Sequence, residues 1–223
     1  METTVLIMAQ GEQRRLADLG YPKQLVAVDG EPILDRTLRL AAEFCPDHVA
    51  LIIGRRELGA ERPGLVTLTD PGHCVLDGIA QTVDLWGSGR VVVLLGDVVF
   101  SRAALWAIFA DGRPFFFAGT PVVSGSFGEL FALSFAADRH KRLAHLLETV
   151  PCRRTSTGTP MRYAVGQQGG HLRRLLWHSQ NGDRRPRQQR YLEIGDWTDD
   201  IDEPSDLARL PDFTLWARAE LGC

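Results

Sequence analysis

Three aspartates sit in sequence contexts that suit the binding of a divalent cation. Asp97 follows the strongly apolar run 90–95 (RVVVLL) and Gly96, and Asp200 and Asp202 lie two residues apart in an acidic stretch. If that stretch is extended, the side chains of Asp200 and Asp202 share one face. Carboxylate oxygens are hard ligands of the kind that Mg²⁺ takes, with phosphates and water completing its octahedron. Two carboxylates about 4 Å apart repel by roughly 4 kcal/mol at an effective dielectric constant near 20, and a cation between them relieves this repulsion.

A turn near the start of the chain combines a glycine with cations that suit phosphate. Gly11 follows the apolar run 3–9 (TTVLIMA) and lets the backbone pass close to a phosphate. Arg14 and Arg15 carry planar forks that match phosphate oxygens, and Lys23 adds a compact charge nearby. The segment predicts a polyphosphate cradle, and the alternative is that these cations are solvated surface charges. It is neither a Walker loop nor a GxGxxG dinucleotide fingerprint.

The elements that must position these residues alternate along the chain. Continuous apolar runs, typical of strands covered on both faces, occupy 3–9, 49–53, 66–68, 90–95 and 115–118. A longer, more exposed strand is expected over 127–135, and helices over 33–44, 75–86, 102–109, 139–147, 172–177 and 207–221. The alternation predicts a three-layer α/β/α sandwich with a mostly parallel central sheet. Such sheets bind ligands in the loops that follow the carboxyl ends of their strands.

Two helix starts carry capping signals. Ser101 suits the N-cap of the helix expected over 102–109 better than Asp97 does, which leaves Asp97 for another role. Ser205 or Asp206 is expected to cap the last helix.

The bulk composition is that of an ordinary globular protein. The chain has 223 residues, which fits a single domain over 1–223 with polar loops near 152–170 and 181–190. A net charge of −3 gives no overall basic field that would attract nucleic acid. The apolar runs reach about seven residues, whereas a membrane span needs roughly 20. Four cysteines without metal-ligand spacing, and no leader pattern, favour reduced thiols in the cytoplasm.

The first turn also resembles the opening signature of the nucleotidyltransferase superfamily. That signature reads roughly A-[AG]-G-x-G-x-R-L, then P-K-x-L and G-x-P-[IL]-[IL], and this chain is similar to it over 9–16, 22–25 and 30–34. The superfamily includes sugar-1-phosphate nucleotidylyltransferases and small-molecule cytidylyltransferases, and it is related to the glycosyltransferase A-type fold. The resemblance implies a nucleotide-diphospho-sugar transferase-like fold in which Arg15 and Lys23 are catalytic and contact the triphosphate. Gln10 and Gln13 depart from the small residue and the glycine of the signature.

The same resemblance extends to both acidic segments. Asp97 begins a D-x-x-F pattern completed by Phe100, and Asp202 precedes an x-P-x-D-L run that ends at Leu207. The resemblance implies that Asp97, Asp200 and Asp202 are metal ligands and that Mg²⁺ is the cofactor. The stretch 70–79 is similar to one near the base in several cytidylyltransferases. Together, the resembling segments assign nucleotide binding to Ala9, Gln10, Gly11, Glu12, Arg14, Arg15, Lys23 and Gly78.

The activity implied is a nucleotidyl transfer. A phosphorylated small molecule, such as a sugar phosphate, a polyol phosphate or a phosphocholine-like acceptor, attacks the α-phosphorus of an NTP of the CTP or UTP/dTTP/GTP type, and pyrophosphate leaves. The acceptor phosphate is already an anion near neutral pH, so no general base is required. Arg153, Arg154, Arg162 and the arginines of 184–190 either bind this phosphate or are exposed loop charges. A homodimer is compatible with the sequence.

Two other functions fit part of the pattern. A glycosyltransferase of the related fold would also hold a metal on carboxylates, but it would use nucleotide sugars. A non-catalytic regulatory domain would bind NTP with Mg²⁺ and release no pyrophosphate. The proline-lysine pair at 22–23 and Arg15 favour the nucleotidyltransferase over the glycosyltransferase.

Overall fold

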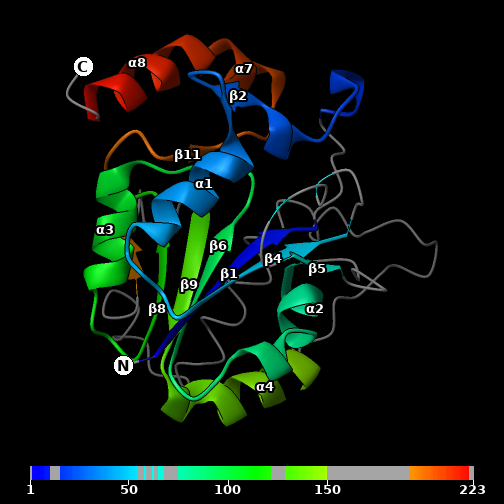
Figure 1. The fold of residues 1–223 in the computed structure, drawn as a ribbon, viewed down its shortest axis with the longest axis vertical. Helices are drawn as coiled ribbons and strands as arrows, with labels where there is room; N and C mark the ends of the chain where they lie inside the picture. The colour runs from blue at the N-terminus through cyan, green and yellow to red at the C-terminus, as the bar shows by residue number, and fades with distance from the viewer. Residues whose placement is uncertain are drawn as a thin grey trace.

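A seven-stranded sheet forms the centre of the protein, in the order β10-β8-β9-β6-β1-β4-β5 (Figure 1). The structure is a computed structural model that describes residues 2–10, 16–54, 65–67, 75–121, 129–149 and 191–220, with the single positions 58 and 62. The strands are β1 (Thr3–Ala9), β4 (His48–Ile53), β5 (Leu65–Thr67), β6 (Arg90–Leu95), β8 (Phe115–Gly119), β9 (Leu130–Phe135) and β10 (Tyr191–Glu193).

The sheet is mostly parallel, as the alternation of strands and helices predicts. β1 pairs in parallel with β4 on one side and β6 on the other, β4 pairs in parallel with β5, and β8 with β10. Only β9 runs the other way, antiparallel to both β6 and β8. The α/β class and the parallel centre of the sheet are therefore confirmed.

The expected character of β9 is wrong. It begins at Leu130 and all six of its residues are buried, whereas the sequence favoured a longer and more exposed strand over 127–135. The partly alternating residues of the segment suggested one solvated face, but β9 lies between β6 and β8 and is covered on both faces. Residues 127 and 128 lie outside the described part of the chain.

In the part of the chain that the structure describes, four helices cover the sheet in two pairs. They are α1 (Ile33–Ala42), α2 (Val75–Ala80), α3 (Arg102–Ala110) and α4 (His140–Thr149). α1 packs beside α3, where Phe44 stacks on Phe109 at 4.5 Å between ring centroids, and α2 packs beside α4. Figure 1 shows the two pairs on either side of the sheet, which gives the three layers expected from the sequence. Ser101 caps α3 as predicted, because its Oγ accepts from the amide of Ala104 at 2.8 Å.

Other helix boundaries differ from the prediction. The segment 75–86 divides into α2 and the 3-10 helix η4 (Val83–Leu85), and α1 ends at Ala42. Two helices, α7 (Pro204–Ala208) and α8 (Leu210–Glu220), replace the single one expected over 207–221. Neither Ser205 nor Asp206 is the N-cap: Glu203 caps α7, and Asp206 at N3 accepts from the amide of Glu203 at 2.7 Å. The helix expected over 172–177 lies outside the described residues.

A second, smaller core joins the C-terminal helices to the region after the first strand. Phe213 and Ala217 of α8 are buried there against Val26, Val28 and Ile201. α8 packs on β2 (Ala27–Val28), which forms a hairpin with β3 (Glu31–Pro32). Figure 1 shows α7 and α8 above one end of the sheet, beside β2 and β11 (Asp199–Asp200). Through this core, the segments 23–28 and 199–202 both pack against α8.

We expect Gly119→Ala to destabilise the fold. Gly119 lies at an irregularity in the β8–β9 pairing, and a Cβ there would be 1.9 Å from the backbone carbonyl oxygen of Glu129. Backbone must move to admit it, and overpacking of this kind costs about 1–3 kcal/mol. Gly112→Ala is the matched control, because nothing lies within 4 Å of its added Cβ. Urea unfolding of both variants measures the effect, and equal stabilities for the two would contradict the packing seen at the sheet.

Candidate functional site

Lys23 lies between two carboxylates that come from distant parts of the chain. It begins the 3-10 helix η2 (Lys23–Leu25), and only 7% of the residue is exposed. Its Nζ lies 2.7 Å from Asp97 Oδ2 and donates a hydrogen bond to Asp202 Oδ1. The structure therefore brings together three residues that the sequence assigned to catalysis and metal binding.

Asp97 reaches this position because β6 ends beside β1. The amide of Gly96 donates to the carbonyl of Met8 at 2.9 Å, which continues the pairing of these two strands by one residue. A Cβ on Gly96 would lie 3.1 Å from both that carbonyl oxygen and the Cβ of Ala9, so a larger residue fits poorly. The carboxylate is thus delivered at the carboxyl edge of the sheet, where parallel α/β proteins bind ligands.

Asp202 lies at the same edge of the sheet because a short two-stranded ribbon brings its segment there. β11 pairs antiparallel with β7 (Val98–Val99), so that Asp200 lies opposite Val98. The amide of Ile201 then donates to the carbonyl of Asp97 at 3.1 Å. Immediately afterwards, the amide of Asp202 donates to Asp206 Oδ2 at 2.9 Å. The backbone on both sides of the Asp202 side chain is therefore fixed by hydrogen bonds.

The two carboxylates keep Lys23 charged although it is buried. Burial alone would lower the pKa of Lys23, because the charged form loses its hydration. The negative charges of Asp97 and Asp202, together with their hydrogen bonds, outweigh burial and raise the pKa above its usual value. Lys23 is therefore a permanent cation at neutral pH, and it neutralises part of the acidic charge around it.

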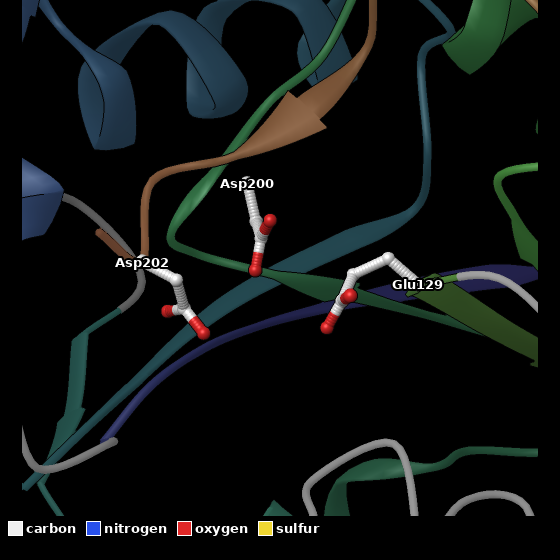
Figure 2. Close-up of side chains that lie close together, drawn as sticks. All are labelled: Glu129, Asp200 and Asp202. Carbon is white, nitrogen blue, oxygen red and sulfur yellow. The ribbon is translucent and has the colours of Figure 1, made fainter. Parts of the chain in front are cut away.

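A group of three carboxylates adjoins the lysine. Oxygen atoms of Glu129, Asp200 and Asp202 all lie within 4.8 Å of one another, and Figure 2 shows the three side chains pointing toward a shared space. An all-oxygen donor set of this kind fits Mg²⁺ or Mn²⁺. The group differs from the predicted trio, because Glu129 joins Asp200 and Asp202 while Asp97 contacts Lys23.

Glu129 was missed by the sequence reasoning. It immediately precedes β9, and because β9 is antiparallel, the beginning of this strand lies at the same edge as the end of β6. The acidic side chain before an apolar run was visible in the sequence. Its meaning depended on the direction of β9, which the sequence pattern did not indicate.

The pKa of Asp200 is raised to about 9. Burial is the largest cause, followed by repulsion from the charges of Asp202 and Asp97, and the attraction of Lys23 opposes these effects only in part. The half-buried carboxyl of Asp200 is therefore protonated near neutral pH when no further cation is bound.

The other predicted nucleotide-binding residues lie at the end of β1 and in α2. Ala9 is fully buried, and Gln10 follows it with its side-chain amide against Gly78: a Cβ on Gly78 would lie 1.8 Å from Gln10 Oε1. The structure thus brings Gln10 and Gly78 together. Gly11, Glu12, Arg14 and Arg15 lie outside the described residues, as do the arginines of 153–162 and 184–190.

Asp200→Asn should stabilise the protein more at pH 8 than at pH 5 in the presence of a chelator. The unfolded carboxyl ionises near its model value of 3.8 and the folded one at about 9. Between these values the folded state binds more protons, so its stability falls as pH rises, at up to ~1.4 kcal/mol per pH unit. Asparagine does not titrate and escapes this loss. Urea unfolding at the two pH values measures the difference, with the exposed Asp84→Asn as control; a pH-independent difference for Asp200→Asn would contradict the raised pKa.

The fold is an α/β sandwich with a carboxylate-lined sheet edge, and comparison with known proteins identifies the family. Residues 5–162 match the MobA-like NTP transferase domain family. The chain therefore belongs to this family, and membership places it among the nucleotidyltransferases. It is also 30% identical over 126 residues to the bifunctional protein GlmU of Chromohalobacter salexigens, in a match that covers 50% of this chain and 25% of that protein. The chain thus corresponds to about a quarter of the length of this curated relative.

Solved structures show the same fold at low sequence identity. A nucleotidyl transferase from Methanothermobacter thermautotroptrophicus has a TM-score of 0.63 and 17% identity, and the match covers 96% of this chain and 98% of that one. The inositol-1-phosphate CTP transferase from T. maritima has a TM-score of 0.60 and 14% identity, over 98% and 96% of the two chains. A Mycobacterium tuberculosis H37Rv protein in complex with manganese has a TM-score of 0.58 and 19% identity, over 95% and 99%. Among the helices described here, none has the length and hydropathy needed to cross a membrane.

Proposed function

We propose that this protein transfers a nucleotidyl group from an NTP to a phosphorylated small molecule and releases pyrophosphate. The observation that carries the proposal is the buried Lys23 between Asp97 and Asp202, at the carboxyl edge of the sheet of a family nucleotidyltransferase. A buried lysine and two carboxylates give one phosphate-binding cation and two hard metal ligands within a few ångströms. This pairing of charges suits a metal-bound triphosphate.

The proposed cation site uses Asp97, Asp200 and Asp202, with Glu129 close to the last two. Their donor atoms are all hard oxygens, which favours Mg²⁺ as the physiological ion. Support also comes from the fold relative of Mycobacterium tuberculosis that was solved with manganese. A divalent cation held there would neutralise charge on the α-phosphate during transfer.

In the proposed mechanism, the protein positions the two substrates and neutralises the charge of their phosphates, and no proton is transferred. Lys23 donates hydrogen bonds to oxygens of the triphosphate, which requires its ammonium to leave the two carboxylates. Arg15 adds a second cation to the departing pyrophosphate, as the sequence implies. The acceptor phosphate is an anion near neutral pH, so no side chain has to act as a base. Catalysis then depends on orientation and on charges fixed before the reaction.

The proposed substrates are an NTP of the CTP or UTP/dTTP/GTP type and a sugar phosphate, polyol phosphate or phosphocholine-like acceptor. The inositol-1-phosphate CTP transferase among the fold relatives supports CTP and a polyol phosphate as part of this range. Ala9, Gln10, Gly11, Glu12, Arg14, Arg15, Lys23 and Gly78 are proposed to contact the nucleotide. We also propose that residues 1–223 act as one domain in the cytoplasm.

The experiment is a pyrophosphate-release screen of the four common NTPs against phosphorylated sugars, polyols and amino alcohols. Release that requires both an NTP and an acceptor supports the proposal. Transfer from nucleotide sugars without pyrophosphate would favour a glycosyltransferase, and NTP binding without release under any condition would favour a regulatory domain.

Lys23→Ala and Asp97→Asn should each lower turnover by at least about a hundredfold in the productive reaction. The expected loss follows from removing one charge that stabilises the transition state, which typically costs about 3–4 kcal/mol of barrier. The exposed Lys141→Ala and Asp84→Asn make the same chemical changes away from the site and should retain turnover. Steady-state pyrophosphate release measures all four variants. Near-full turnover in both site variants would show that these residues do not have the proposed roles.

Lys23→Met should strengthen Mn²⁺ binding to the protein without nucleotide. The ammonium occupies the space between Asp97 and Asp202, so lysine and metal compete for the same oxygens. We expect a decrease of about tenfold or more in the dissociation constant, measured by electron paramagnetic resonance of free Mn²⁺; this corresponds to ~1.4 kcal/mol. Arg209→Gln is the control, since it removes a nearby cation that pairs with Asp199 at 2.5 Å instead. An equal gain in both variants would indicate a general charge effect without competition.

A further inference from the structure

The ribbon of β7 and β11, which carries the second acidic segment, is too short to be stable through its strand pairing alone. β7 and β11 share only two residue pairs, Asp199 opposite Val99 and Asp200 opposite Val98. Isolated two-stranded ribbons are marginal even at greater length. Yet the position of Asp202 beside Asp97 depends on this ribbon. Something beyond the strand pairing must therefore fix it.

Three side chains close the ribbon at the end away from Lys23. Thr198 Oγ1 accepts from the amide of Ser101 at 3.0 Å, and the Ser101 hydroxyl donates to Asp196 Oδ2. Asp196 Oδ1 accepts from the amide of Thr198 at 2.8 Å, which completes a closed network. Ser101 is fully buried and Thr198 is 3% exposed, so these hydrogen bonds are largely shielded from water.

The network is the same number of residues away from the acidic side chain in both chain segments. Ser101 follows Asp97 by four residues, and Thr198 precedes Asp202 by four. Between them run the two residue pairs of the ribbon and the hydrogen bond from Ile201 to the carbonyl of Asp97. A shift at Thr198 would be transmitted through this short extended stretch to both Asp200 and Asp202.

Ser101 also anchors the network to the rest of the fold. The same hydroxyl oxygen that contacts Asp196 caps α3 by accepting from Ala104 at 2.8 Å. The start of this helix is also held in place, because the amide of Arg102 donates to Glu220 Oε1 of α8 at 3.0 Å. The ribbon is thus fastened to a helix that is itself held at its first turn.

We propose that Thr198, with Asp196 and Ser101, is a positioning residue that sets the separation of Asp97 and Asp202 for metal binding. The inference rests on the proposed function, because it assigns metal binding to those aspartates. None of the three side chains is assigned to contact substrate. Hydrogen-bonding partners one step removed from a metal site typically contribute 10–100-fold to metal affinity or activity.

The test compares Thr198→Val with Thr198→Ser and with Thr82→Val in the full chain. Valine keeps the shape of threonine but leaves the buried amide of Ser101 without its acceptor, whereas serine retains the hydroxyl. Thr82 is a matched control, because it is fully buried and its Oγ1 accepts from Trp86 Nε1 at 3.1 Å away from the acidic residues. Mn²⁺ affinity by electron paramagnetic resonance, kcat, KM and thermal unfolding are measured for each.

We expect Thr198→Val to weaken Mn²⁺ binding by about tenfold or more. Its kcat should fall with little change in KM for the acceptor. Thr198→Ser should restore both values, and Thr82→Val should lose thermal stability with Mn²⁺ affinity intact. If Thr198→Val does not fold, Asp196→Asn at an exposed position removes the charged acceptor of the Ser101 hydroxyl and should weaken Mn²⁺ binding severalfold.

Two outcomes would overturn the inference: Mn²⁺ affinity unchanged in these network variants, or a wild-type protein that binds no Mn²⁺. Failure of the proposed function has a different signature. A wild-type protein that binds Mn²⁺ and loses this affinity on Thr198→Val, but releases no pyrophosphate with any substrate pair, would keep the positioning role and contradict nucleotidyl transfer.

Discussion

The contact of Lys23 with Asp97 and Asp202 is the constraint on which the architecture of the site depends. Lys23 and Asp202 are 179 residues apart in the chain, and Asp97 comes from the end of a central strand. Burying an ammonium group costs several kcal/mol unless opposite charges accompany it. The end of β6, the β7–β11 ribbon and η2 must therefore all be in place together. Removing any one of them would leave a buried charge without its partners.

The direction of the strands explains why acidic groups concentrate at one edge. β1 and β6 run in parallel, so the loops after both strands open on the same side, and antiparallel β9 brings its beginning there as well. As a result, Asp97 and Asp202 contact the buried Lys23, and Glu129 and Asp200 lie close to Asp202. The raised pKa of Asp200 reflects this excess of negative charge. Such an imbalance favours the binding of a further cation.

Sequence patterns predicted the fold better than the details of the site. The runs 3–9 and 90–95 are continuously apolar because β1 and β6 are covered on both faces, and their positions were predicted closely. The direction of β9 has no local signature, so Glu129 escaped notice. α7 ends at Ala208 with Arg209 as its C-cap, and Pro211, in the first turn of α8, has no backbone N–H that could continue the helix from α7. The resemblance implied a common site for Lys23, Asp97 and Asp202, and the structure brings them together, but the direct ion pairing of the lysine with both carboxylates was not predicted.

We propose that Lys23, Asp97 and Asp202 surround one metal–triphosphate. The most direct measurement is a crystal structure of the protein with Mn²⁺ and a non-hydrolysable NTP analogue, recorded with anomalous scattering at the manganese edge. We expect an anomalous peak in contact with carboxylate oxygens of Asp97 and Asp202, and the Lys23 ammonium moved from these oxygens to a phosphate. A nucleotide bound elsewhere, with Lys23 still paired to both aspartates, would contradict it.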